Sequence, residues 1–111
     1  MNTADEVVMA PRTLEALQGS IAKWEAIVAG TGEDEGSFNC PLCHRFANHR
    51  QDDQQCLDCP VMKVTGKKHC YGSPYHDFVR AEEDGDKNEM TKRAQAELDF
   101  LKSLLPPGAS Q

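Results

Sequence analysis

The sequence predicts a mainly α-helical protein: a helical hairpin with a central, irregular, cysteine-rich segment that binds zinc. Near both ends of the chain, apolar residues recur at spacings of three and four, which is typical of helices with one buried face. In the middle, five cysteines fall within residues 40–70, and four of them form two Cys-x-x-Cys pairs. Two such pairs are typical of a tetrahedral zinc site.

A chain of 111 residues is expected to form one domain. Its parts are predicted as an arm at 1–10, a helix at 11–30, a zinc segment at 37–72, a helical region at 73–105 and a tail at 106–111.

The first helix is predicted to begin at Pro11, because proline suits the first helical position, and to end at Gly30. An acidic link at 30–36 follows it. Lys23 and other polar residues are assigned to the faces of this helix that do not carry its apolar stripe. The apolar stripe consists of Leu14, Leu17, Ile21, Trp24 and Val28.

The middle segment shows neither a helical nor a strand period, and it is too polar to fold by burial alone. A bound metal is the usual means by which so small a core is stabilised. The five candidate zinc ligands are Cys40, Cys43, Cys56, Cys59 and Cys70.

Tetrahedral zinc takes four ligands, so one of the five cysteines is left over. Cys40 and Cys43 are the securest pair. Cys70 stands just before a predicted helix start, where a thiolate is favoured, so it competes with Cys56 and Cys59. A redox Cys-x-x-Cys motif and an iron–sulfur cluster are alternatives, but the βαβ context and the ferredoxin spacing are both missing.

The C-terminal region is predicted to form two helices. Ser73 and Pro74 favour a helix start, and Asp86 with Glu89 resembles a capping box that starts the last helix. The last helix carries a second apolar stripe, which is expected to pack on the first helix. This stripe consists of Met90, Ala94, Leu98, Leu101 and Leu105.

Three further apolar residues, Ile27, Phe100 and Leu104, lie beside these stripes and widen the apolar surface. Because a small monomer seldom exposes a large apolar patch, the sequence predicts a homodimer or a hetero-partner that covers it.

The motif Cys-Pro-Leu-Cys, a polar insert, Cys-x-x-Cys-Pro-Val, Thr65-Gly66, Cys70 and Ser-Pro-Tyr resembles a group of small cysteine-rich proteins of bacteriophage and bacterial genomes. The resemblance spans roughly residues 14–105. It implies zinc binding and a phage or prophage setting, it favours Cys70 as part of the motif, and it implies no enzymatic activity.

Charge is distributed unevenly along the chain. Residues 1–39 carry two Lys/Arg against seven Asp/Glu, residues 40–80 six against four, and residues 81–111 four against seven. A net charge of −6 argues against a nonspecific nucleic-acid binder. The alternative of a zinc-finger-like nucleic-acid module would use the basic residues of the cysteine segment: Arg45, Arg50, Lys63, Lys67 and Lys68.

No signal peptide or membrane-spanning stretch is visible, so a cytoplasmic protein is expected, in the host cytoplasm if it is phage-encoded. No catalytic constellation stands out, so the chain is not expected to be an enzyme. The sequence therefore predicts a small zinc-stabilised protein-binding module, and the phage setting that the resemblance implies would make it an inhibitor or modulator of a host or defence protein.

Overall fold

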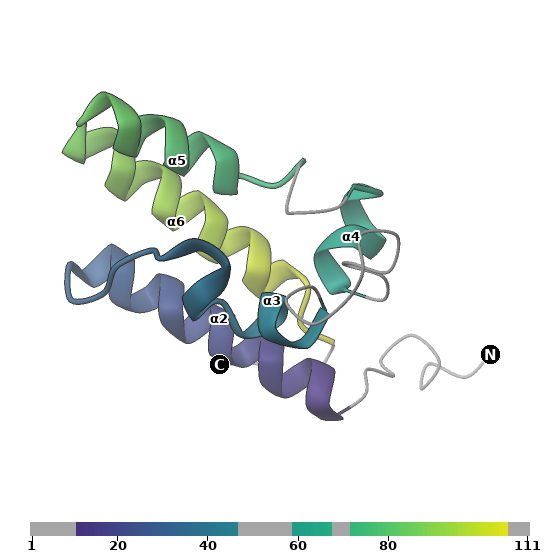
Figure 1. The fold of residues 1–111 in the computed structure, drawn as a ribbon. Helices are drawn as coiled ribbons and strands as arrows, with labels where there is room; N and C mark the ends of the chain where they lie inside the picture. Colours follow the sequence, from purple (N-terminus) through teal and green to yellow (C-terminus); the bar gives the residue numbers. More distant parts are fainter. Residues whose placement is uncertain (1–10, 47–58, 68–71, 107–111) are drawn as a thin grey trace.

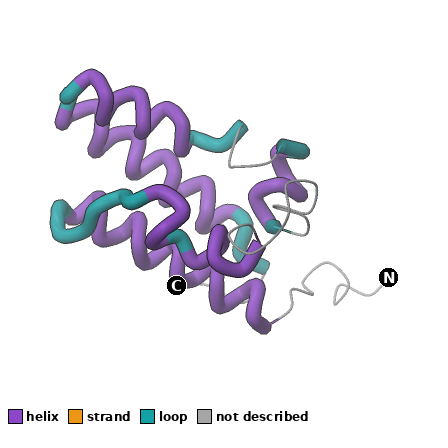
Figure 2. The backbone as a smooth tube through the Cα atoms, viewed as in Figure 1, coloured by secondary structure: helices purple, strands orange, loops and turns teal. Residues whose placement is uncertain are grey.

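The computed structural model describes residues 11–46, 59–67 and 72–106, and in these ranges every regular element is helical (Figures 1 and 2). The predicted helical class is confirmed. The elements are α2 (Pro11–Ala29), the 3-10 helix η1 (Gly36–Asn39), α3 (Pro41–Phe46), α4 (Pro60–Thr65), α5 (Tyr75–Asp84) and α6 (Lys87–Ser103).

Helix α6 packs against both α2 and α5, and it runs antiparallel to each of them (Figure 1). The predicted pairing of the first and last long helices is therefore present. Within the two stripes, Leu17, Ile21 and Ala94 are completely buried, and Trp24 and Leu101 are nearly so. Trp24 also meets Phe78 of α5 edge-on, with ring centroids 5.0 Å apart, so all three helices share one core.

The ends of the long helices follow local sequence signals. Helix α2 ends at Ala29, followed by Gly30 with φ of 84°. Asp86 caps α6, because its side chain accepts a hydrogen bond from the backbone N–H of Glu89 at 3.1 Å. Gly85 turns the chain between α5 and α6 with φ of 69°, a conformation that glycine adopts without strain.

The start of α5 differs from its prediction by a residue or two. The helix begins at Tyr75, and the Ser73 hydroxyl accepts a hydrogen bond from the Tyr75 N–H at 3.3 Å. The N-cap residue is therefore Pro74 and not the predicted Ser73, whose hydroxyl instead closes a turn just ahead of the helix.

The irregular central segment was predicted wrongly where the structure describes it, because three short helices (η1, α3 and α4) lie there. Helices α3 and α4 each have six residues, too few to show a period in the sequence, and each begins with a proline that directly follows a cysteine. Helix α3 packs on α2.

The apolar residues behind the dimer prediction are less exposed than expected. Ile27, Phe100 and Leu104 are partly buried and pack against the core. Among the described residues the exposed large apolar side chain is that of Val64, which is 63% exposed on α4. Self-association stays a prediction, with a smaller apolar surface to support it.

No helix in the described ranges is long and apolar enough to cross a membrane.

Candidate metal centre and adjoining pocket

Cys40 and Cys43 form one compact unit at the start of α3. Cys40 has an extended backbone, with φ of −105° and ψ of 109°, and Pro41 begins the helix that carries Cys43. Both the backbone N–H and the side chain of Cys43 hydrogen-bond to the Cys40 sulfur. The two cysteines are half-buried and not joined by a disulfide. An N–H group directed at a cysteine sulfur, with a second thiol beside it, is an arrangement that suits a metal-binding turn.

The surroundings of Cys40 favour its thiolate. The hydrogen bond with the Cys43 side chain has the largest effect and, with the Cys43 N–H, the Lys23 charge and the Ser20 hydroxyl, lowers the pKa of Cys40 to about 6, although burial opposes the shift. The thiolate is the form of cysteine that binds metals.

Helix α2 packs against the turn formed by Cys40–Cys43. A Cβ atom at Gly19 would lie 3.0 Å from the Pro41 ring, so a glycine lets α3 approach closely. The next residue, Ser20, is buried, and its hydroxyl accepts a hydrogen bond from the Leu42 N–H at 3.3 Å and lies 3.8 Å from the Cys40 sulfur. Sequence reasoning overlooked both residues, although a Gly-Ser pair within a predicted helix is a signal of close packing.

The other predicted ligands are less well defined by the structure. Cys59 is buried just before α4, in the same apolar cluster that Cys40 and Cys43 adjoin. Within the described ranges, no three Cys, His, Asp or Glu side chains lie close enough together to hold a metal ion. Cys56 and Cys70 lie outside those ranges. The structure thus brings together Cys40 and Cys43, and the rest of the ligand set stays a prediction.

The basic residues of the alternative reading are only partly described. Arg45, Lys63 and Lys67 are exposed, whereas Arg50 and Lys68 lie outside the described residues. The Arg45 side chain is held against α2, because its Nε lies 3.4 Å from the Thr13 hydroxyl oxygen.

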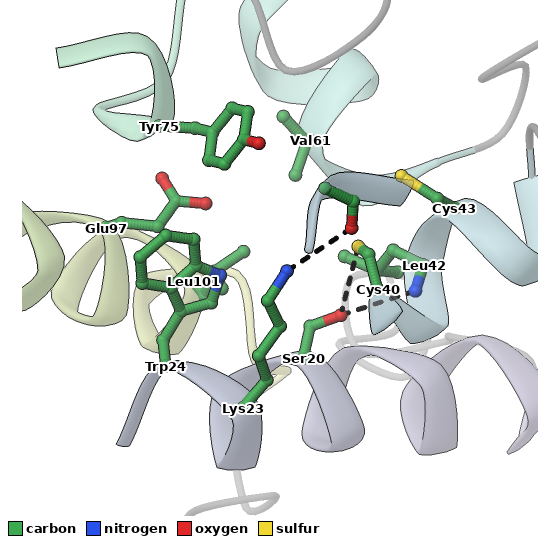
Figure 3. A pocket seen from close by; sticks show the side chains of 11 residues that line it. Ser20, Lys23, Trp24, Cys40, Leu42, Cys43, Val61, Tyr75, Glu97 and Leu101 are labelled. Atoms are coloured by element: carbon green, nitrogen blue, oxygen red, sulfur yellow. Dashed lines mark hydrogen bonds between the residues drawn. The ribbon is translucent and has the colours of Figure 1, made fainter. Parts of the chain in front are cut away.

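Beside the cysteine turn lies a cavity of about 150 Å³ (Figure 3). Its walls come from every helical element of the described chain. Trp24, Leu42, Val61 and Leu101 make most of its surface apolar. The polar side chains on its wall are Ser20, Lys23, Cys40, Cys43, Tyr75 and Glu97.

Lys23, on the wall of this cavity, belongs to a buried ion pair. Lys23 and Asp34 approach to 2.8 Å, and their side chains are only 8% and 4% exposed. Asp34 also accepts hydrogen bonds from the Tyr75 hydroxyl and the Gly36 N–H, both at 3.0 Å. Lys23 was predicted to lie off the apolar stripe, and it is nevertheless covered there by the link that contains Asp34. The acidic link folds back over α2, and its carboxylate neutralises the lysine.

Glu97 is a further buried charged residue on the wall of this cavity, and no prediction from the sequence included it. It is 2% exposed on α6, and its Oε1 has no hydrogen-bond partner among the described residues. Burial raises the pKa of Glu97 to about 8, with smaller contributions in the same direction from Cys40 and Asp34, against the effects of Ser73 and Lys23. In the sequence, Glu97 lies between Ala94 and Leu98 of the predicted apolar stripe, and this position was the signal that could have indicated a buried glutamate.

This raised pKa predicts a pH-dependent stability for the folded chain. Unfolded Glu97 ionises near pH 4.5, whereas folded Glu97 keeps its proton until about pH 8. Between these values the folded state binds more protons, so the free energy of unfolding falls as pH rises, by a few kcal/mol in total. Glu97→Gln should remove this term. Urea unfolding at several pH values is expected to show the variant gaining stability over wild type from pH 5.5 to 8.5.

Glu83→Gln is the matched control, because Glu83 is exposed on α5. A difference between wild type and Glu97→Gln that stays constant with pH would contradict the assignment.

The chain was also compared with known proteins. No protein-family model, curated protein or solved structure matches it. The resemblance to phage cysteine-rich proteins therefore stays an expectation, and the functional argument depends on the site itself.

Proposed function

We propose that this chain is a small zinc-stabilised protein-binding module. Cys40 and Cys43 would supply two thiolate ligands, and two of Cys56, Cys59 and Cys70 would complete the shell. The observation that carries the metal assignment is the compact Cys40–Pro41–Leu42–Cys43 turn on α2, in which the Cys43 N–H and side chain lower the pKa of the Cys40 thiol. Four thiolates close the coordination shell of zinc, so the metal's role would be structural.

The position of the cysteine turn supports a stabilising role. It is seated on Gly19 and Ser20 of α2, and Cys59 precedes α4 within the same apolar cluster. A metal that joins these segments would tie the short helices to the long ones, which a small apolar core does weakly by itself.

The charge distribution supports a protein partner with a basic surface. Exposed carboxylates gather where α5 turns into α6, at Glu82, Glu83, Asp84 and Asp86, and the whole chain carries a net charge of −6. A surface of one sign steers and orients a partner of the opposite sign. The phage setting that the resemblance implies makes a host or defence protein the expected class of partner.

The experiment compares two charge-reversed proteins as bait. The zinc-loaded chain, the variant Glu82→Lys/Glu83→Lys and the control Glu15→Lys/Asp99→Lys are each used to capture partners from a bacterial lysate, with and without nuclease treatment. The proposal expects a protein that the wild type and the control retain and that the first variant loses. Its direct affinity, measured with purified partner, should drop at least tenfold in that variant.

Two outcomes would contradict the proposal. One is a captured protein whose binding is indifferent to the reversal at Glu82 and Glu83. The other is recovery of nucleic acid alone, lost on nuclease treatment and falling steeply with salt. The second outcome would favour the nucleic-acid alternative, in which Arg45, Lys63 and Lys67 contact phosphates.

A further inference from the structure

Glu97, a buried residue with one carboxylate oxygen that lacks a partner among the described residues, lies on the wall of the cavity. Figure 3 shows Glu97 of α6, Trp24 and Lys23 of α2, and Tyr75 of α5 gathered around this space. One carboxylate oxygen is bonded by Ser73, and Oε1 has no partner among the described residues. A buried polar atom that lacks a partner costs on the order of 1–3 kcal/mol, so a ligand that supplies a donor gains that energy back.

The charges around the cavity select a cation. Lys23 is neutralised by Asp34 at 2.8 Å, and its ammonium also lies 3.5 Å from the Gly36 carbonyl oxygen. The charged group that remains on the wall, Glu97, is negative when ionised. A positively charged group in the cavity would therefore be attracted by its walls, and an anion would be repelled.

The shape and chemistry of the walls narrow the class of cation. A cavity of about 150 Å³ is the size that holds a ligand such as benzene in an engineered apolar core. Only one oxygen of Glu97 is free, which suits the point charge of an ammonium better than the two-pronged fork of a guanidinium. Trp24 and Tyr75 offer aromatic surface to a cation, and Leu42, Val61 and Leu101 offer apolar contact to an alkyl stem.

We propose that this cavity is a binding site for a short alkyl chain that ends in a primary ammonium. The ammonium lies against the carboxylate of Glu97, and the alkyl stem packs on the apolar wall formed by Leu42, Val61 and Leu101. The ligand is a free alkylamine or the side chain of a lysine on another protein. The site is separate from the acidic surface of the proposed function and does not depend on it.

The test uses the fluorescence of Trp24, which is the one tryptophan in the chain and lies on the cavity wall. The full-length, metal-loaded protein is titrated at pH 8.5 with n-butylammonium, n-butanol and butyrate. At this pH Glu97 is largely ionised and the amine is still charged. We expect saturable binding of n-butylammonium, at least tenfold weaker binding of n-butanol, and none of butyrate.

Two variants complete the test. Glu97→Gln should weaken n-butylammonium binding at least tenfold, whereas the exposed control Glu15→Gln should leave it unchanged. Circular dichroism tests whether both variants are folded. If Glu97→Gln is unfolded, the comparison of the three probes in the wild type still tests the proposal.

A second arm identifies the source of the cation. If Nα-acetyl-lysine methylamide binds as tightly as n-butylammonium, the ligand is a lysine side chain. If only n-butylammonium binds, the ligand is a free amine. Equal binding of n-butanol or butyrate, or unchanged amine affinity in folded Glu97→Gln, would overturn the proposal.

Discussion

Replacing Cys40 by serine is expected to unfold the chain at neutral pH. If Cys40 is a ligand of structural zinc, the substitution removes a thiolate from a shell that has no spare donor in this turn. Structural zinc contributes apparent binding free energies of about 10–16 kcal/mol in small zinc domains, as much as or more than the roughly 5–15 kcal/mol that stabilises a typical domain. The expected result is loss of bound zinc together with loss of the helical circular dichroism signal.

The control comes from the other cysteines. Serine variants of all five are measured for zinc content and helicity, and because four thiolates fill a tetrahedral site, one variant is expected to keep both. That variant identifies the cysteine outside the shell. Full helicity in Cys40→Ser and in Cys43→Ser would contradict a structural role for the metal.

Asp34→Ala is expected to destabilise the fold by about 3–5 kcal/mol, because it leaves the Lys23 ammonium buried without its counter-charge. The Lys23 and Asp34 side chains are 8% and 4% exposed, and Asp34 also accepts hydrogen bonds from Tyr75 and the Gly36 N–H. The substitution therefore removes one shared acceptor from three donors at once. Urea denaturation of the zinc-loaded protein measures the loss.

The matched control is a second ion pair, which joins α2 and α6 at the surface. Glu25 and Lys102 are 3.7 Å apart and each about 40% exposed, so Glu25→Ala should change stability by at most about 1 kcal/mol. The double variant Lys23→Met/Asp34→Ala should recover part of the loss, because no buried charge remains unpaired. Equal effects of Asp34→Ala and Glu25→Ala would contradict the importance of the buried pair.

The long helices could be predicted because their signals are local. The stop at Gly30 and the cap at Asp86 depend on backbone conformation and on hydrogen bonds within a few residues. The buried faces follow from the period of the apolar residues, and Leu17, Ile21, Leu98 and Leu101 all lie in the core. Such features are written into any short stretch of the sequence.

The pocket could not be predicted in the same way, because it depends on contacts between distant segments. Lys23 and Asp34 pair across a loop, and Glu97 meets Ser73 across two helices. A charged residue placed on an outer face by helical period can still be covered by a loop that folds back. Proline directly after a cysteine, at Pro41 and Pro60, was the local signal for the short helices.

Metal analysis of the intact chain tests the central claim most directly. The protein is purified under reducing conditions without added metal, and its zinc content is measured alongside its helicity before and after chelation. We predict one zinc ion per chain, a colourless protein, loss of helical signal on chelation, and recovery with zinc. Replacement by cobalt should give the intense visible bands of a tetrahedral thiolate site. A folded, reduced, metal-free chain, or the brown absorption of an iron–sulfur cluster, would contradict the central claim.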